Sequence, residues 1–210
     1  MLELIHKLWD CFASALYPRS CFGCRAPGTY WCARCHAHYR PQTYRLETGM
    51  TVYAAHPYHQ SRIKNALKQL KYRGSSDIAD ALALVLATAV PPDIARDAEC
   101  AWIPMTASRA RERGFNQSEL LARSVARHLG IPATDALFKT RDTRPQSTLG
   151  RAERLKNLRG AFAVIEHYKP RSTVIIVDDV STTGATLTEA ARVLKNAGAK
   201  TVIGAVVAHG

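Results

Sequence analysis

The fold of this chain is decided by the stretch Thr173-Val-Ile-Ile-Val-Asp-Asp-Val-Ser-Thr-Thr-Gly-Ala-Thr-Leu187. Its first five residues are all β-branched and predict a buried strand, and the residues from Ala185 to Ala197 favour a helix. Two adjacent carboxylates, Asp178 and Asp179, follow the predicted strand. The pattern predicts strand, loop and helix, with both carboxylates at the carboxyl edge of a parallel sheet, where open α/β sheets bind ligands.

The loop between this strand and helix predicts a phosphate-binding site. It contains Ser181, Thr182, Thr183, Gly184, Ala185 and Thr186. Hydroxyls and backbone N–H groups at a helix N-terminus bind anions, and Gly184 lets the backbone curve around one. A phosphate with vicinal hydroxyls nearby, as in ribose 5-phosphate, suits this loop and the two acids together. A polar turn and an N-capped helix are the structural alternative, but they require neither paired acids nor so many hydroxyls.

The same stretch resembles the phosphoribosyl pyrophosphate signature of type I phosphoribosyltransferases, in which two acidic residues and a Thr-Thr-Gly loop follow an apolar strand. The resemblance implies an α/β fold with a parallel sheet flanked by helices. It also implies that Asp178 and Asp179 hold the ribose hydroxyls, that residues 182–186 hold the 5-phosphate, and that Mg²⁺ accompanies phosphoribosyl pyrophosphate. Positive charge develops on the ribose as pyrophosphate leaves, so carboxylates near the ring and cations on the leaving group favour the reaction.

Two Cys-x-x-Cys pairs near the N-terminus predict a structural zinc site. Their four cysteines are Cys21, Cys24, Cys32 and Cys35. Four thiolates at this spacing complete a closed tetrahedral site with no open position for water. Either His36 or His38 is able to replace one thiolate. A redox role needs a thioredoxin-like βαβ pattern, which is missing, and disulfides are unexpected without an export signal. We therefore expect a small zinc ribbon.

Length and patterning predict two modules. The 210 residues suffice for one α/β domain with a small appendage. The polar stretch from Pro41 to Met50 is interpreted as a connector between a zinc module, residues 1–40, and a phosphoribosyltransferase-like domain, residues 51–210. Met1 to Tyr17 have the spacing of an amphipathic helix that is too polar to span a bilayer, so we expect no membrane span and a cytoplasmic protein.

Basic residues are in excess and predict an anionic partner. The formal net charge is +12 at pH 7, which favours polyanions without selecting among them, and a solvated basic surface is the alternative. Met105 to Gly114 are interpreted as a loop that carries Arg109, Arg111 and Arg113. Guanidinium groups bind phosphates through two parallel hydrogen bonds, so this loop is expected to hold a pyrophosphate leaving group. A solvated loop is again the alternative.

The remaining elements follow from periodicity and caps. Strands are expected over Thr51–Tyr58, Ala98–Pro104 and Thr201–Ala208, and helices over Ser61–Lys71, Asp77–Val90 and from an Asn116 N-cap to Leu129. Residues 148–158 predict a basic helix or lid. The basic turn from Lys71 to Gly74 is suited equally to an anion contact and to capping a helix C-terminus.

Several motifs occur in the order found in ComF-family proteins, which the chain resembles over nearly its whole length. They are Tyr17-Pro-Arg19 before the cysteines, Lys71-Tyr-Arg-Gly74, Ile103-Pro104, the Arg-Gly-Phe-Asn-Gln stretch that ends at Gln117, the segment from Arg144 to Phe162, and the phosphoribosyl loop. The resemblance implies a role in competence and DNA uptake during natural transformation. Single-stranded DNA in the cytoplasm and competence proteins would be its partners.

The function has three interpretations on this basis. The first is DNA handling by a protein that binds phosphoribosyl pyrophosphate or a nucleotide, although few aromatic residues are interleaved with the arginines. The second is an active phosphoribosyltransferase that uses a nitrogen acceptor, for which the sequence assigns neither an acceptor pocket nor a general base. The third is a sensor of phosphoribosyl pyrophosphate that performs no chemistry.

Overall fold

The computed structural model describes residues 19–38, 40–58, 61–73, 75–143 and 150–210, and it divides the chain into two units, Met1–Tyr39 and Arg40–Gly210. The predicted helix over residues 1–17 lies outside the described residues. In the first unit, helix α2 (Ala33–Ala37) begins at Cys32, whose sulfur accepts a hydrogen bond from the Cys35 N–H. Phe22 and Tyr30 stack with ring centroids 5.3 Å apart. This small unit therefore has little apolar core of its own.

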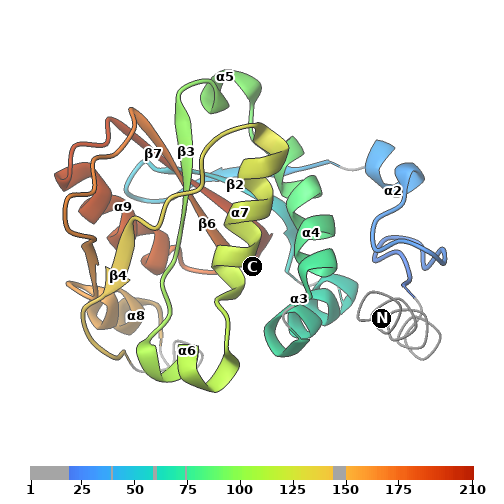
Figure 1. Cartoon of the computed structure of the whole chain (residues 1–210), viewed down its shortest axis with the longest axis horizontal. Coiled ribbons are helices and arrows are strands. Elements are labelled where there is room, and N and C mark those ends of the chain that lie inside the picture. The colour runs from blue at the N-terminus through green and yellow to red at the C-terminus, as the bar shows by residue number, and fades with distance from the viewer. Residues whose placement is uncertain (1–18, 39, 59–60, 74, 144–149) are drawn as a thin grey trace, which may run out of the picture. The chain divides into compact units, whose positions relative to one another are not determined.

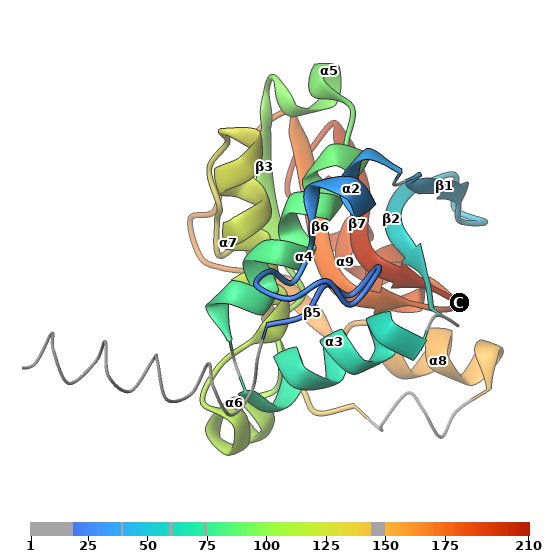
Figure 2. The ribbon, with the colours of Figure 1, turned by 90° about the vertical axis from the view of Figure 1, so that its right-hand side faces the viewer.

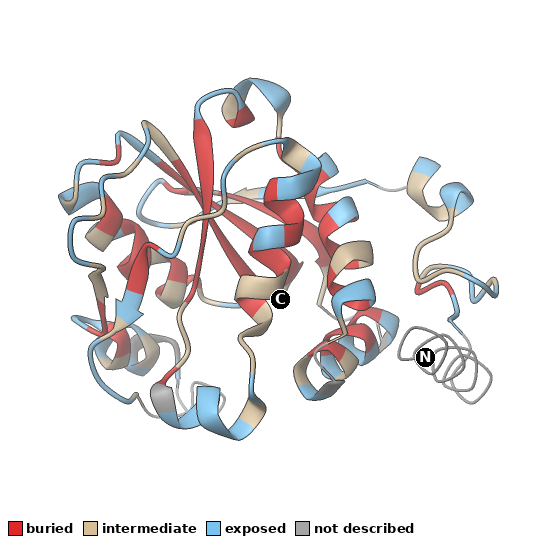
Figure 3. Cartoon of the chain, viewed as in Figure 1, coloured by how far each residue is buried: buried red, intermediate tan, exposed pale blue. Residues whose placement is uncertain are grey.

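The second unit is built on a five-stranded sheet in the order β1-β2-β7-β6-β3 (Figure 1). The strands are β1 (Gln42–Arg45), β2 (Thr51–Pro57), β3 (Ala98–Trp102), β6 (Thr173–Ser181) and β7 (Thr201–His209). Strands β2, β7, β6 and β3 run parallel, and β1 pairs antiparallel with β2 at one edge. The parallel strands are almost entirely buried, as expected for a sheet covered on both faces (Figure 3).

Helices cover both faces of this sheet (Figures 1 and 2). On one face, α4 (Ser76–Ala89) contacts β2 and β7, and α7 (Gln117–Leu129) contacts β3 and β6. Helix α9 (Ala185–Asn196) packs on the other face, where Val174 and Ile176 of β6 join Leu187 and Leu194 of α9 in one core. Successive strand residues point to opposite faces, so Ile175 and Val177 face α4 and α7. The predicted α/β fold is confirmed.

The smaller elements gather mainly at the carboxyl end of the parallel strands. Helix α3 (Ser61–Arg73) follows β2, α6 (Ala107–Arg113) follows β3, and α8 (Arg151–Leu158) follows a hairpin strand, β4 (Leu137–Lys139). Strand β4 pairs antiparallel with β5 (Phe162–Val164). Helix α5 (Pro92–Ala95) lies at the opposite end of the sheet, before β3 (Figure 1). No helix within the described residues is both long and apolar enough to cross a membrane.

Three local predictions are wrong. The stretch expected as a connector, Pro41 to Met50, contains β1, which pairs with the free edge of β2. The expected arginine loop is helix α6, because the Thr106 side chain caps its start and Gly114, at φ +75°, ends it. Strand β6 does not stop before the two acids but continues to Ser181. Each error arises where tertiary pairing or a cap prevails over local composition.

The extension of β6 determines where the acids lie. Pairing between β6 and β3 ends at Val177 opposite Trp102, whereas pairing with β7 continues from Asp178 opposite Val206 to Ser181 opposite His209. Residues 178–181 therefore extend beyond the end of β3, while β7 still pairs with them. This step in the sheet opens a cavity beside the acids.

Candidate functional site

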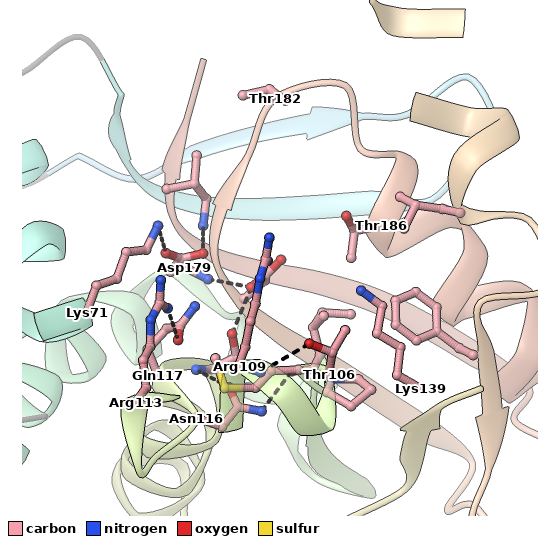
Figure 4. A pocket seen from close by; sticks show the side chains of 18 of the residues that line it. Lys71, Thr106, Arg109, Arg113, Asn116, Gln117, Lys139, Asp179, Thr182 and Thr186 are labelled. Atoms are coloured by element: carbon pink, nitrogen blue, oxygen red, sulfur yellow. Dashed lines mark hydrogen bonds and ion pairs between the residues drawn. The ribbon is translucent and has the colours of Figure 1, made fainter. Parts of the chain in front are cut away.

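A cavity of about 530 Å³ lies at this step (Figure 4). It is bounded by the end of β6, the segment from Ile103 through α6 to the start of α7, the β4–β5 hairpin and α8. Five cationic and two acidic side chains line it. The cations are Lys71, Arg109, Arg113, Lys139 and Arg154, and the acids are Asp178 and Asp179. The volume lies in the range of small-molecule sites, and the excess of cations suits a polyanion.

Asp178 is a buried carboxylate held from two directions. Its Oδ1 accepts hydrogen bonds from the Ser118 hydroxyl at 2.8 Å and from the Asp179 N–H at 2.9 Å. Burial, reinforced by the neighbouring negative charge of Asp179, nevertheless raises the pKa of Asp178 well above its ordinary value. The fold thus keeps a carboxyl group in the cavity although its ionised form is disfavoured there.

Asp179 has a cation beside it. Lys71, from the last turn of α3, places Nζ 2.5 Å from Asp179 Oδ2, and Asp179 Oδ1 accepts from the Val180 N–H at 3.0 Å. Burial opposes the charge of Lys71, but attraction to Asp179 outweighs it and raises the pKa of Lys71. The sequence left an anion contact and a helix cap open for this basic turn. In the structure Lys71 lines the cavity and contacts an anionic group of the protein itself, the Asp179 carboxylate.

These contacts bear on the magnesium ion that the phosphoribosyltransferase signature implies. Mg²⁺ requires oxygen ligands at about 2.0–2.1 Å in octahedral geometry. Asp179 Oδ2 already contacts the Lys71 ammonium, and Asp178 Oδ1 already accepts two hydrogen bonds. A Mg²⁺ ion bound directly to Asp179 Oδ2 therefore does not fit while Lys71 holds that oxygen.

The predicted phosphate loop joins β6 to α9. Gly184 adopts φ +72° directly before α9, and a small hollow of about 20 Å³ is lined by the loop together with Asp178. The Thr183 hydroxyl accepts from the Ala185 N–H at 3.4 Å, and the Thr182 hydroxyl accepts from an Arg154 guanidinium N–H at 2.8 Å. The loop thus presents hydroxyls and a helix N-terminus, and a cation from α8 lies against it.

The turn between β1 and β2 supports this loop from behind. Leu46 packs so closely on Gly184 that a Cβ there would lie 2.3 Å from Leu46 Cδ2. A second cavity, of about 300 Å³, lies between this turn, Thr182 and Thr183 of the loop, and Leu155 of α8. The loop is therefore a wall shared by two cavities.

Helix α6 separates the three predicted arginines. Arg109 and Arg113 are one turn apart and both line the main cavity, whereas Arg111, between them, lines none of the cavities described here. Residues four apart lie on one face of a helix, and those two apart do not. Arg113 also donates to the Gln117 side chain at 3.1 Å.

The other predicted site residues distribute over the main cavity and two smaller hollows. Asp178, Asp179, Thr182 and Thr186 line the main cavity. Ser181, Thr183, Gly184 and Ala185 line only the smaller hollows around the loop. The predicted N-cap is confirmed, because the Asn116 side chain accepts from the Ser118 N–H at 3.0 Å. It also donates to the Ile103 carbonyl at 3.0 Å, which ties α7 to the end of β3.

Sequence reasoning missed several lining residues. Ser118 gave no signal beyond its place in a helix start, and Arg154 was attributed only to a lid. Lys139 comes from a strand that was not predicted and donates to the Thr143 hydroxyl at 2.8 Å. Burial and the nearby Arg109 lower the pKa of Lys139. These residues reach the cavity through tertiary structure, which no local pattern encodes.

The four cysteines form a separate cluster in the first unit. The Sγ atoms of Cys21, Cys24, Cys32 and Cys35 all lie within 4.8 Å of one another, close enough to hold one metal ion. The Cys21 sulfur accepts from the N–H groups of Gly23 at 3.3 Å and Cys32 at 3.4 Å. Burial would raise the pKa of Cys21, but these backbone donors outweigh it and lower the pKa.

Comparison with known proteins identifies relatives of the chain. Residues 116–210 match the phosphoribosyl transferase domain. DNA utilization protein YhgH of Escherichia coli O157:H7 is 35% identical over 142 residues, which are 65% of this chain and 62% of that protein. Competence protein F of Haemophilus influenzae is 36% identical over 103 residues, 48% of this chain and 45% of that protein. Competence protein ComFC of Bacillus subtilis is 32% identical over 143 residues, 67% of this chain and 56% of that protein.

Solved structures share lower similarity. Glutamine phosphoribosylpyrophosphate amidotransferase from Bacillus subtilis matches with a TM-score of 0.39 and 22% identity over 60% of this chain and 25% of its own. Orotate phosphoribosyltransferase from Aeropyrum pernix matches with a TM-score of 0.36 and 17% identity over 84% and 90%. The chain spans about three fifths of the length of the YhgH proteins it matches. It is a homologue of competence proteins F and ComFC and of DNA utilization protein YhgH, with a phosphoribosyl transferase domain at residues 116–210.

Proposed function

We propose that the main cavity binds phosphoribosyl pyrophosphate or a nucleotide. Residues 182–186 would hold the 5-phosphate, Asp178 and Asp179 the ribose hydroxyls, and Arg109 with Arg113 the diphosphate. The observation that supports this most is one cavity whose wall combines two carboxylates, the loop residues Thr182 and Thr186, and five cations. Mg²⁺ would accompany the ligand on its diphosphate oxygens and supply charge neutralisation there.

The proposed cellular role is DNA handling in the cytoplasm, in competence and DNA uptake. It is supported by the names of the relatives and by the net charge of +12. The proposed DNA-binding surface is on α3, where Lys64, Lys68 and Tyr72 are spaced four residues apart. Tyr72 is 75% exposed, and Lys64 lies 4.9 Å from the centre of the Tyr58 ring. An exposed aromatic ring beside lysines suits the stacking of a base of single-stranded DNA, and competence proteins are the expected protein partners.

The four-cysteine cluster is proposed to hold a structural zinc ion. Closely spaced thiolates that accept backbone N–H bonds have the chemistry of a closed zinc site. Four protein ligands would leave no position for a reacting water, so the ion would hold the unit together without acting in catalysis.

Calorimetric titration with phosphoribosyl pyrophosphate and Mg²⁺ tests the binding proposal. Asp179→Asn should weaken binding by about tenfold or more, because the ribose hydroxyls lose a charged acceptor. The matched control is Glu166→Gln, an exposed acid, 87% of whose side chain is accessible, outside the cavity lining. Equal affinities for wild type and Asp179→Asn would reject the assigned site, and no binding by the wild type would reject the function.

An active phosphoribosyltransferase is the second candidate. Lys139 is the candidate general base, because it lines the cavity and because burial and the nearby Arg109 lower its pKa, which shifts it toward the neutral amine that accepts a proton. Release of pyrophosphate, measured with pooled nucleobase and amine acceptors, distinguishes the two candidates. Release that depends on an acceptor and is lost in Lys139→Met would make the protein an enzyme, whereas tight binding without release would favour a sensor or scaffold.

The DNA role has its own test. The logarithm of the binding constant for a short single-stranded oligonucleotide should fall linearly with the logarithm of the salt concentration. The reason is that lysines that bind the phosphates release the counterions condensed on them. Tyr72→Ala should lower affinity by about 1–3 kcal/mol if a base stacks on the ring, and Tyr72→Phe should preserve it. An unchanged affinity in Tyr72→Ala would remove α3 from the DNA surface.

A further inference from the structure

We propose that Lys71 is the resident counter-cation of Asp179 and occupies the position that a divalent metal ion would take on this carboxylate. The cavity then binds its ligand without a metal ion coordinated to Asp179. The inference rests on the proposed function only in placing a phosphoribosyl diphosphate beside these residues, because the exclusion of metal is a property of the protein alone.

The geometry supports this from the side of the lysine. Nζ of Lys71 lies 2.5 Å from Asp179 Oδ2, with 33% of the Lys71 side chain and 10% of the Asp179 side chain exposed. The pair is thus shielded from solvent far more than a surface ion pair, which contributes little. Lys64 and Lys68 lie on the same helix but are exposed and do not line the cavity. Among the described lysines of α3, Lys71 alone faces the site.

The geometry also supports it from the side of the acids. Asp179 Oδ1 accepts from the Val180 N–H, and Asp178 Oδ1 accepts from Ser118 and from the Asp179 N–H. A divalent ion on Asp179 Oδ2 would have to displace the ammonium or stand next to it. Two like charges about 4 Å apart repel strongly in a partly buried site, so both cannot bind the same oxygen.

The charge balance of the cavity agrees with this role. Five cationic side chains and two acids line it, so a polyanion meets excess positive charge even without a metal ion. If the Lys71 ammonium were removed by substitution, Asp178 and Asp179 would form an adjacent acidic pair with no counter-cation from α3. Such a pair offers the hard oxygen ligands that Mg²⁺ and Mn²⁺ prefer. Lys71 therefore decides whether the carboxylates form a metal site.

Electron paramagnetic resonance of Mn²⁺ tests the inference without any ligand, on the whole chain with its cysteine site loaded with zinc. Lys71→Met should bind Mn²⁺ at least about tenfold more tightly than wild type, and Lys71→Met with Asp179→Asn should lose that gain. Lys71→Arg, which keeps the charge, should exclude Mn²⁺ as wild type does. Lys195→Met, which removes an exposed lysine of α9 outside the cavity lining, should also behave as wild type.

Titration with phosphoribosyl pyrophosphate completes the test. Removal of Mg²⁺ with a chelator should lower the affinity of Lys71→Met for phosphoribosyl pyrophosphate more than it lowers that of the wild type. Added Mg²⁺ should restore the affinity of the variant. Wild type that binds Mn²⁺ through Asp179, or equal Mn²⁺ affinity in wild type and Lys71→Met, overturns the inference and leaves the proposed function standing. Exclusion of Mn²⁺ by Lys71 together with no binding of phosphoribosyl pyrophosphate overturns the proposed function alone.

Discussion

At the scale of single residues, Asp178 is a site residue whose charged form destabilises the folded protein. The residue is buried, and burial with the neighbouring Asp179 charge raises its pKa. Two hydrogen bonds, from Ser118 and from the Asp179 N–H, offset only part of this unfavourable environment. Strained or poorly solvated groups of this kind persist where function requires them.

Asp178→Asn should therefore make the ligand-free protein more stable, by about 1 kcal/mol, while weakening ligand binding. Asparagine keeps an oxygen that accepts both hydrogen bonds but carries no charge. Because the folded pKa of Asp178 lies above the unfolded value of 3.8, its favourable contribution is complete below that pH and is lost as pH rises through the folded pKa. Urea denaturation from pH 4 to 8 should show the variant's advantage growing with pH.

The control for this comparison is Glu166→Gln, which neutralises an exposed acid. Its stability should follow that of the wild type across the same pH range. A destabilised Asp178→Asn at neutral pH would show instead that the charge at Asp178 supports the fold.

The sequence identified the paired acids but not their partners. Asp178 and Asp179 follow an apolar run, so a strand end with carboxylates was predictable. Ser118 lies 60 residues from Asp178 in the chain, and Lys71 is more distant still. Which distant side chain reaches a carboxylate depends on how helices dock on the sheet, and no local pattern contains that information.

At the scale of elements, the phosphate loop depends on a hairpin that the sequence did not predict. Gly184 combines a positive φ with close contact to Leu46, in the turn between β1 and β2. A glycine is thus required there for its backbone conformation and for its lack of a side chain. The antiparallel edge strand positions the loop by packing.

Gly184→Ala and Gly130→Ala separate these two requirements. Gly130 has φ +68° at the end of α7, and a Cβ there would meet nothing within 4 Å. Gly130→Ala should lose about 1–2 kcal/mol of stability from backbone strain alone. Gly184→Ala should lose more, and should also lower affinity for phosphoribosyl pyrophosphate. If thermal unfolding gave the same loss of stability for both variants, the Leu46 side chain would move aside for the new methyl group with no loss of stability.

Glu99 is a second element-scale feature, at the other end of the sheet. This buried carboxylate of β3 accepts from the Thr134 hydroxyl at 2.5 Å, the Tyr168 hydroxyl at 2.8 Å and the Arg171 N–H at 2.8 Å. It thereby joins two connecting segments to the central sheet. Burial and Glu99 together raise the pKa of Tyr168, so this hydroxyl remains a donor.

Glu99→Ala should cost about 2–4 kcal/mol of stability, because three donors lose their acceptor in a buried place. Asp97→Asn is the matched control, since Asp97 is exposed and its carboxylate is 3.7 Å from Arg171. Ligand affinity should be unchanged in both variants at temperatures where they are folded. Stability of Glu99→Ala within about 0.5 kcal/mol of wild type would mean that water replaces the acceptor.

The success of prediction differed among the elements. Helices α4, α7 and α9 and strands β2, β3 and β7 carry periodic or apolar patterns and were predicted to within a few residues, and β6 was predicted except for its last four residues. The β4–β5 hairpin has three residues in each strand and forms only where the two segments meet. Helix α6 is rich in arginine and lacks an apolar stripe, so only its Thr106 cap signalled a helix. Short elements are decided by their tertiary environment.

At the scale of the whole molecule, the two units should differ in their response to a chelator. A strong zinc chelator should unfold residues 19–38, because a segment with so few apolar contacts depends on its metal for folding. The sheet unit has its own core and should remain folded. Hydrogen exchange followed by mass spectrometry should show protection lost before residue 40 and retained in β2, β6 and β7.

Metal content provides the matched comparison. Cys24→Ser should lower bound zinc, whereas Cys100→Ala, which removes a buried cysteine of β3, should leave it unchanged. Full zinc content in Cys24→Ser would contradict the four-thiolate site.

The step in the sheet at the end of β6 has a consequence for genetics. Residues 178–181 do not pair with β3, so β7 is the strand that fixes their position. Strand β7 contributes no side chain to the lining of the main cavity. Random mutagenesis should nevertheless recover loss-of-function alleles at positions 206–208, and the map of such alleles would mark as essential a strand that lines no part of the main cavity.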